Sequence, residues 1–303
     1  MFKNLYLYHL IESDQIDLTA IAQQLSQQKA RKCESSEPNT MGWCKALPAF
    51  DEDELLIKKS SHALIRMMSD QKILPTSVIQ EELTKRLKKI EQDKGYTLGK
   101  KDKKAIKEQV IEEMLPKAFS KSSYTWGWLD IEAGLLAVDT GSAKKADEFV
   151  HFLMKTCPDV GIAPFLAVDS VQARMIEWLD DGKISEGFTI DQACELYEPS
   201  EQKPTVTFKD WNLDNEDVKK QIRSGKLPAK LAISYGENLS FVLTSQFLIK
   251  SIKFHEKSDK QDSHDDQRHK EETDFFLAAE QLRVAIAGLI DACGGISQGD
   301  IDE

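Results

Sequence analysis

Apolar and polar residues alternate with a period of two along several stretches of the chain, which is the pattern of half-buried β-strands. The stretches that predict strands are 2–11, 63–68, 124–130, 134–139 and 162–168. Three further runs, at 229–234, 239–243 and 247–254, are rich in β-forming residues and separated by turns. These three runs predict an antiparallel meander.

Other stretches place apolar residues three and four positions apart, which predicts amphipathic helices. They are 16–30, 142–155 with Ser142 as its cap, 171–179, and a short helix capped by Asp214 that ends at Ser224-Gly225. A final helix stops at Gly294-Gly295 and carries an apolar face made of Phe275, Ala278, Leu282, Ala285 and Leu289. The order of strands and helices predicts an α+β fold, with mixed or antiparallel sheets and packed helices.

Residues 73–122 predict two helices that project as an αα-hairpin. Ser77 and Gln80 have the spacing of a capping box at the start of the first helix. Its apolar stripe is Ile79, Leu83, Leu87 and Ile90. Gly95 and Gly99 supply the turn, and Pro116 ends the second helix. That second helix directs Ile106, Val110 and Met114 inward.

Charge makes this hairpin unusual. Residues 84–107 hold ten Lys or Arg and three Asp or Glu, a net charge of +7, whereas the whole chain has 40 basic and 51 acidic residues and a net charge of −11. Positive charge gathered on one projecting element of an acidic protein is typical of a surface that meets a polyanion. A solvated helix face that keeps the protein soluble explains the same pattern, and both interpretations stay open.

The 303 residues are 41% hydrophobic and 30% charged, which is enough to form a substantial core and about two domains. No run approaches the ~18 apolar residues of a membrane span, and the first ten residues lack the pattern of a signal peptide. We therefore expect a cytoplasmic protein. The five cysteines form no CxxC pair, so we expect buried or half-buried free thiols.

The common nucleotide-binding and hydrolytic motifs are absent, so the sequence predicts no cofactor and no catalytic residue. One near-match is Pro158-Asp159 with Asp181-Gly-Lys183, the loose spacing of a Mg²⁺-dependent nuclease in which Asp159 and Asp181 hold the metal and Lys183 orients water. Asp181 and Lys183 follow a helix rather than lie on a strand, which argues against this alternative. The polar segment 255–270 has the composition of a metal site, but His264 and His269 are spaced too poorly for one face of a helix.

Several aromatic residues have two interpretations. Trp126, Trp128 and Trp178 could stack on nucleic-acid bases, but aromatics at strand or helix spacing are more often part of a core. Phe119 stands outside any periodic pattern, between Lys117 and Lys121 and just after a proline. Such a residue either fills a local gap or inserts into a partner.

Taken in order, a set of short matches spans nearly the whole chain. They are Phe2-Lys-Asn-Leu5, Met41-Gly-Trp43, Ile73-Leu-Pro75, Leu115-Pro-Lys-Ala-Phe-Ser-Lys121, 134–139, Ser142-Ala-Lys-Lys-Ala-Asp147, Ile222-Arg-Ser-Gly-Lys226, Lys230-Leu-Ala232 and the Gly-Gly ending after the last helix. On these residues the chain resembles the RdgC family of recombination-associated DNA-binding proteins. The resemblance implies a horseshoe-shaped protomer that closes as a homodimeric ring around DNA. It also implies binding of single- and double-stranded DNA without sequence preference, association with the nucleoid, and restraint of the recombinase RecA by occupying DNA.

By position, Phe119 matches the family's aromatic that inserts into the partner subunit, and Lys117 and Lys121 match its basic flanks. Where the family has a basic and polar pair on a projecting finger, this chain has Lys209-Asp210-Trp211, so only Lys209 is carried over. The residues predicted to bind DNA are Lys85, Lys88, Lys89, Lys100, Lys101, Lys104, Lys117, Lys121 and Lys209.

The predicted organisation has three parts: residues 1–74 with 123–198 as a central α+β region, residues 75–122 as a basic helical tip, and residues 199–303 as a C-terminal region. Because no element suited to reading base edges is visible, the lysines predict phosphate contacts with steep salt dependence. The alternatives are the nuclease described above and a protein–protein adaptor whose basic hairpin docks on an acidic partner.

Overall fold

A computed structural model of the chain describes residues 2–255 and 267–297. Within them the chain is α+β, with seven α-helices and one open sheet of twelve strands whose neighbours all pair antiparallel. The strand order is β2-β4-β5-β6-β1-β12-β11-β10-β8-β9, with β3 added to β4 and β7 added to β1. The α+β fold predicted from the pattern of apolar residues is confirmed.

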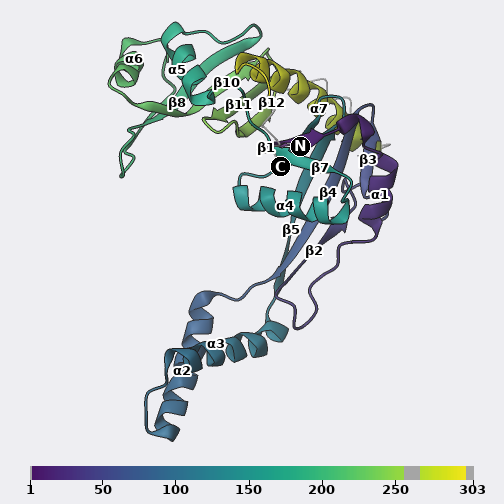
Figure 1. Cartoon of the computed structure of the whole chain (residues 1–303), viewed down its shortest axis with the longest axis vertical. Coiled ribbons are helices and arrows are strands. Elements are labelled where there is room, and N and C mark those ends of the chain that lie inside the picture. The colour runs from purple at the N-terminus through teal and green to yellow at the C-terminus, as the bar shows by residue number, and fades with distance from the viewer. Residues whose placement is uncertain (1, 256–266, 298–303) are drawn as a thin grey trace.

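The first half of the sheet comes from the N-terminal part of the chain. Its strands are β1 (Leu5–Ile11), β2 (Asn39–Cys44), β3 (Leu56–Lys59), β4 (His62–Lys72), β5 (Ser120–Asp130), β6 (Leu135–Asp139) and β7 (Gly161–Pro164). The helices α1 (Leu18–Ser26) and α4 (Ala143–Thr156) cover one face, and a 3-10 turn (Ser13–Gln15) precedes α1. The strands β2, β4 and β5, here called the arm, extend from this half toward the far end of the molecule (Figure 1).

The second half of the sheet forms the opposite end of the molecule. Its strands are β8 (Phe188–Tyr197), β9 (Thr205–Lys209), β10 (Leu227–Tyr235), β11 (Leu239–Thr244) and β12 (Ile249–Phe254). Three helices pack on it: α5 (Val171–Asp181), α6 (Glu216–Arg223) and α7 (Gln267–Ala292). The predicted meander of three strands is confirmed as β10, β11 and β12.

Successive side chains of β4 pack into two separate cores, one on each face of the sheet. Leu64 belongs to the larger apolar cluster under α5, α6 and α7, whereas Ile65 belongs to the cluster under α1 and α4. The two halves of the sheet meet at a single register pair, Leu5 opposite Ile249. Helix α7 strengthens this narrow junction, since its Phe275 packs edge-on against Phe2 with ring centroids 6.3 Å apart.

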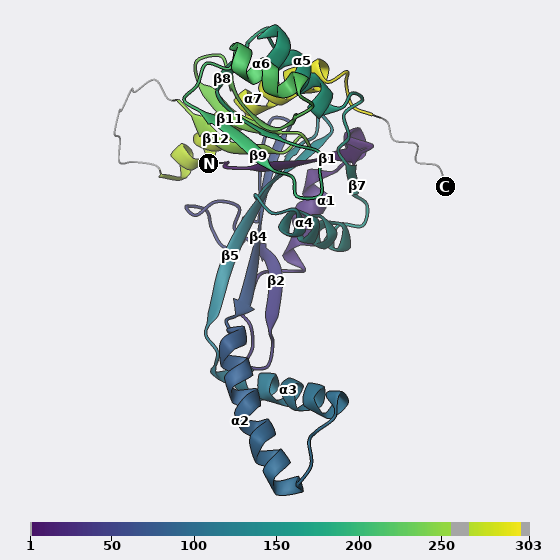
Figure 2. The same cartoon turned by 90° about the vertical axis from the view of Figure 1, so that its left-hand side faces the viewer.

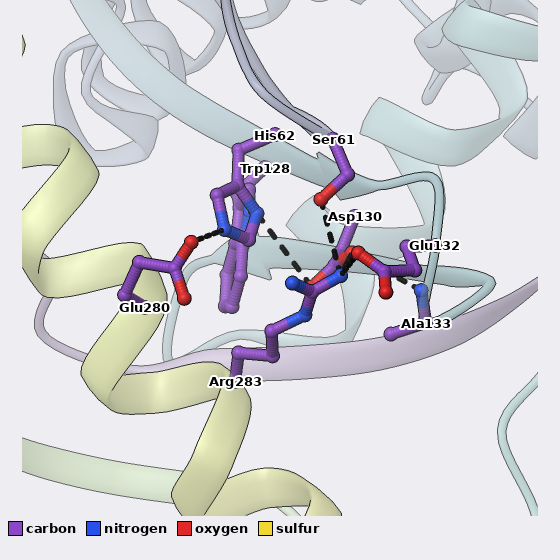
Figure 3. A network of polar contacts seen from close by, with 8 residues as sticks. All are labelled: Ser61, His62, Trp128, Asp130, Glu132, Ala133, Glu280 and Arg283. Atoms are coloured by element: carbon purple, nitrogen blue, oxygen red, sulfur yellow. Dashed lines mark hydrogen bonds and ion pairs between the residues drawn. The ribbon is translucent and has the colours of Figure 1, made fainter.

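A buried polar network also fixes α7 to the arm (Figure 3). His62 is fully buried, accepts a hydrogen bond at Nδ1 from the Trp128 indole (3.1 Å), and its Nε2 lies 3.1 Å from Glu280 of α7. Asp130, 1% exposed, pairs with Arg283 of α7 at 2.9 Å. A buried carboxylate is costly unless it is paired, so Arg283 compensates Asp130 and orients α7 on β5.

Several predicted details were wrong. Helix α2 (Thr76–Lys94) begins just after Pro75 and has no side-chain cap, so Ser77 and Gln80 form no capping box. Asn215, not Asp214, caps α6 by accepting from the Asp217 N–H. The strand predicted at 162–168 is only Gly161–Pro164, and the helix predicted at 16–30 ends at Ser26. The expected cap at Ser142 is confirmed.

The five cysteines are free thiols, as expected, with Cys157, Cys194 and Cys293 buried and Cys33 and Cys44 half-buried. Among the residues that the structure describes, no helix is long and apolar enough to cross a membrane.

Candidate nucleic-acid interface

The predicted αα-hairpin is present at the far end of the arm (Figure 2). Helix α2 packs on α3 (Lys100–Met114), and a 3-10 turn (Leu115–Lys117) leads into β5. We keep the name basic helical tip for residues 75–122. Its apolar seam is thin, with Ile79, Leu83, Leu98, Val110 and Leu115 as its buried apolar residues. A thin seam leaves most of both helix surfaces in solvent.

An ion pair holds the two helices together near the arm. The Arg86 guanidinium of α2 binds both carboxylate oxygens of Glu113 on α3, one of them at 2.9 Å, and also contacts Glu82. The hydrogen bond to Glu113 raises the pKa of Arg86, and the same bond lowers the pKa of Glu113. Arg86 is therefore occupied within the hairpin.

Positive charge concentrates at the outer end of the tip, where α2 ends and α3 begins. Lys100, Lys101 and Lys104 lie in the first turns of α3 and are exposed. Cations at a helix N-terminus oppose the helix dipole and cost some stability. In this turn Lys103 pairs with Glu91 of α2 at 3.6 Å, and the remaining positive charge faces solvent.

The lysines predicted to bind DNA are all exposed. Lys85 pairs with Glu81 at 2.8 Å and Lys104 with Glu108 at 3.8 Å, each one helical turn away on the surface. Exposed pairs of this kind are weak and are readily exchanged for a phosphate. Within residues 2–255 and 267–297, Lys88, Lys89, Lys100 and Lys101 have no ion-pair partner. Their charge is available to a ligand.

Phe119 lies where the tip joins β5 and is 86% exposed. It therefore does not fill a local gap. Its backbone is held firmly, because its carbonyl accepts a hydrogen bond from the Ile73 N–H at 2.7 Å. Ile73, which makes that hydrogen bond, is also about half exposed. Lys117 and Lys121 flank it and are exposed, as the sequence predicted.

Two lysines that the sequence analysis did not single out lie beside Lys121. A shallow cavity of about 420 Å³ at the junction of tip and arm is lined by Lys72, Lys121 and Lys145, with Ser123 and the segment 71–75. The Lys72 ammonium donates to the Ala118 carbonyl at 3.2 Å. The structure thus brings α4, through Lys145, next to the base of the tip.

Lys209 is far from the tip along the sheet. It ends β9 opposite Ala193 of β8, and the two strands form a hairpin that projects from the second half of the sheet (Figure 1). The turn of this hairpin is residues 198–204. Asp210 beside it has φ = 51°, and Trp211 is 45% exposed.

The residues of the nuclease alternative belong to different parts of the fold. Asp159 follows α4 and lies 3.5 Å from the Gln24 amide of α1. Asp181 ends α5, which packs on β10 and α6, and Lys183 lines a cavity beside Asp214. Among the described residues no cluster of His, Cys, Asp or Glu could hold a metal ion. His264 and the aspartates of the polar segment lie outside the described residues.

The tryptophans support the core interpretation. Trp128 is 2% exposed and Trp178 is 7% exposed, and Trp126 packs against the same cluster, with its indole donating to the Ala46 carbonyl at 2.9 Å. Tyr124, on the same face of β5, is 48% exposed and is the aromatic of the arm most available to a ligand.

Comparison with known proteins completes the picture. Residues 1–296 match the family model described as "Putative exonuclease, RdgC". Three similar curated proteins, each named "Recombination-associated protein RdgC", come from Dechloromonas aromatica, Aeromonas hydrophila subsp. hydrophila and a Janthinobacterium species. The first is 35% identical, covering 97% of this chain and 97% of that protein. The second is 32% identical, covering 98% and 99%, and the third is 32% identical, covering 97% and 98%. On this full-length similarity, the chain belongs to the RdgC family.

Proposed function

We propose that the protein binds DNA without sequence specificity and takes part in homologous recombination. The observation that carries the proposal is the outer end of the basic helical tip, where exposed lysines lie on a chain whose net charge is −11. Lysine contacts with phosphates supply affinity that is independent of sequence and falls steeply with salt. The name of the relatives, recombination-associated protein, agrees with this role.

The binding mode we propose is a homodimeric ring that encircles single- or double-stranded DNA. The protomer has the tip at one end and the second half of the sheet at the other, joined by the arm, which is a shape suited to closing around a rod (Figure 1). Phe119 inserts into the partner subunit, and Lys117 and Lys121 face phosphates beside it. The tip, residues 75–122, acts as one unit, with residues 1–74 and 123–198 as a central region and 199–303 as a C-terminal region.

In this proposal the protein works by occupancy, limiting the access of RecA to DNA in the nucleoid of the cytoplasm. The description of the family model names an exonuclease, which makes Mg²⁺-dependent cleavage the alternative to exclude. The adaptor alternative, in which the tip docks on an acidic protein, predicts no binding to DNA alone.

Fluorescence anisotropy with unrelated oligonucleotides, single- and double-stranded, across a salt series and with Mg²⁺ tests these possibilities. We expect sequence-independent binding with a steep log–log salt slope, and intact DNA on a gel afterwards. Shortened DNA would support the nuclease. Failure to bind at low salt would overturn the proposal and favour the adaptor.

A further inference from the structure

A second positive site lies on the arm, well away from the lysines of the tip. Arg66 of β4 is 6% exposed, and its guanidinium stacks 4.8 Å from the Tyr124 ring centroid and 5.5 Å from that of Trp126. The two aromatic rings hold its plane in place. Arg66 therefore presents a rigid cation rather than a mobile surface charge.

This buried cation lacks a carboxylate partner among the residues that the structure describes. Its Nε donates to the Cys44 sulfur at 3.3 Å, and no protein group within residues 2–255 and 267–297 accepts from its two terminal nitrogens. Burial raises the pKa of the Cys44 thiol, so the thiol stays neutral and supplies no counter-charge. Burying a charge away from any carboxylate is costly, and here the two aromatic rings and the Cys44 sulfur are the groups that offset this cost among the described residues.

Arg66 is one of the residues that line an open cleft of about 380 Å³ between the arm and the loops before and after β2. Lys29 and Lys45 also line the cleft, and each is paired with an acidic residue of the loop, Asp53 and Glu52 respectively. Both acidic side chains are more than four-fifths exposed, so these pairs are weak and the lysines can turn toward a bound anion. Three cations against two carboxylates leave the cleft positive.

We infer that the cleft formed by Arg66, Lys29, Lys45 and Tyr124 binds a phosphate group. A guanidinium with two free nitrogens in a fixed plane matches two phosphate oxygens, and two lysines at the rim add charge. The half-exposed Tyr124 ring provides an apolar wall on which a base or sugar can rest. The phosphate comes either from the DNA backbone, in which case the inference deepens the proposed function, or from a free phosphate anion.

Isothermal titration calorimetry of the full-length protein with inorganic phosphate tests the cleft itself. Arg66→Lys keeps the charge but removes the two-pronged contact, and we expect it to weaken phosphate binding about tenfold. Lys58→Arg, which also exchanges one cation for another but at an exposed lysine outside the cleft, is the matched control and leaves binding unchanged. The inference is overturned if Arg66→Lys binds phosphate as tightly as the wild-type protein does, or if the wild-type protein binds no phosphate.

A variant that is expected to bind phosphate more tightly tests the cleft even if Arg66→Lys fails to fold. Glu52→Gln with Asp53→Asn deletes the two competing carboxylates, both highly exposed, and we expect phosphate to bind several-fold more tightly. Unchanged or weaker binding in this double variant would contradict the phosphate site, whatever Arg66→Lys does.

The source of the phosphate follows from the same variants with a labelled DNA duplex. If DNA occupies the cleft, Arg66→Lys weakens DNA binding and Arg66→Gln lowers the log–log salt slope by about 1. If the Arg66 substitutions leave the salt slope of DNA binding unchanged but abolish the binding of inorganic phosphate, the ligand is a free anion. Wild-type protein that binds no DNA would refute the proposed function, while the phosphate titration would still decide the cleft.

Discussion

The basic helical tip and the buried polar network beneath α7 use charge in opposite ways. In the tip, lysines gather at the start of α3 against the helix dipole, and among the described residues Lys100 and Lys101 have no ion-pair partner while Lys103 and Lys104 are paired. In the buried network, Asp130 pairs with Arg283 of α7 and His62 contacts Glu280 of α7. Exposed charge contributes little to stability but is available to a ligand, whereas buried paired charge sets geometry. The charge of the tip therefore adds little to stability, whereas the buried network beneath α7 holds the arm in place.

The sharpest way to break this comparison is to remove one cation from each region. Arg283→Met leaves Asp130 buried without its partner, and we expect a loss of about 3–5 kcal/mol in the free energy of unfolding, measured by urea denaturation. The matched change in the tip, Arg86→Met, breaks an ion pair with the largely exposed Glu113 and should cost far less than Arg283→Met. Equal losses would show that the two regions do not differ as described.

DNA binding, unlike stability, should depend on the exposed charges of the tip and not on the buried pair beneath α7. Lys100→Glu with Lys101→Glu reverses two exposed charges of the tip, and we expect affinity for a duplex to fall roughly a hundredfold, with a salt slope smaller by about 2. The fold should be unaffected. Lys58→Glu with Lys155→Glu makes the same change in charge on exposed residues of the body. If both pairs weaken binding equally, net charge rather than the tip is responsible.

Asp70, at the outer part of the arm, should make the free energy of unfolding depend on pH in the acid range. The backbone N–H of Cys33 and the hydroxyl of Ser122 donate to Asp70 and lower its pKa from 3.8 to about 2. A lowered pKa means that the ionised group stabilises the fold above pH ~4, and that this contribution, about 2 kcal/mol, is lost as the pH falls toward 2.

Asp70→Asn should therefore be less stable at neutral pH and show a flatter decline of unfolding free energy between pH 5 and pH 2. Glu113→Gln, in the exposed pair of the tip, provides the comparison and should change that decline little. An unaltered acid profile in Asp70→Asn would mean that Asp70 makes no such contribution.

Phe119→Ser is expected to have the smallest effect on stability, because the ring is 86% exposed and surface changes usually stay within about 0.5 kcal/mol. We expect the dimer to dissociate at least about tenfold more readily in analytical ultracentrifugation, with weaker retention of DNA. Trp211→Ser, at another exposed aromatic residue, is the control. Unchanged sedimentation and DNA binding in Phe119→Ser would refute its role in closing a ring.

Strongly periodic elements could be predicted from the sequence, and elements exposed on both sides could not. The face of α7 with Phe275 and Leu289 and the meander at β10–β12 were correctly predicted, because each buries one side against a core. Strands β8 and β9 were not predicted, since their hairpin is only partly buried and its polar residues lie on both faces. The start of α2 was misplaced because the path of the chain at Pro75, rather than the Ser77 side chain, sets it.

For the candidate site, the sequence by itself determined the charge, the two helices of the tip and the isolation of Phe119 from any apolar pattern. These are local properties, carried by residues a few positions apart. Only the tertiary structure decided that Gly42 must lack a side chain, because a Cβ there would lie 2.4 Å from the Ala30 Cα. It alone placed Arg66 between Tyr124 and Trp126 and facing a cleft, and placed Arg283 beside Asp130. Such pairings join residues many positions apart, and they depend on strand register and helix packing that no local pattern records.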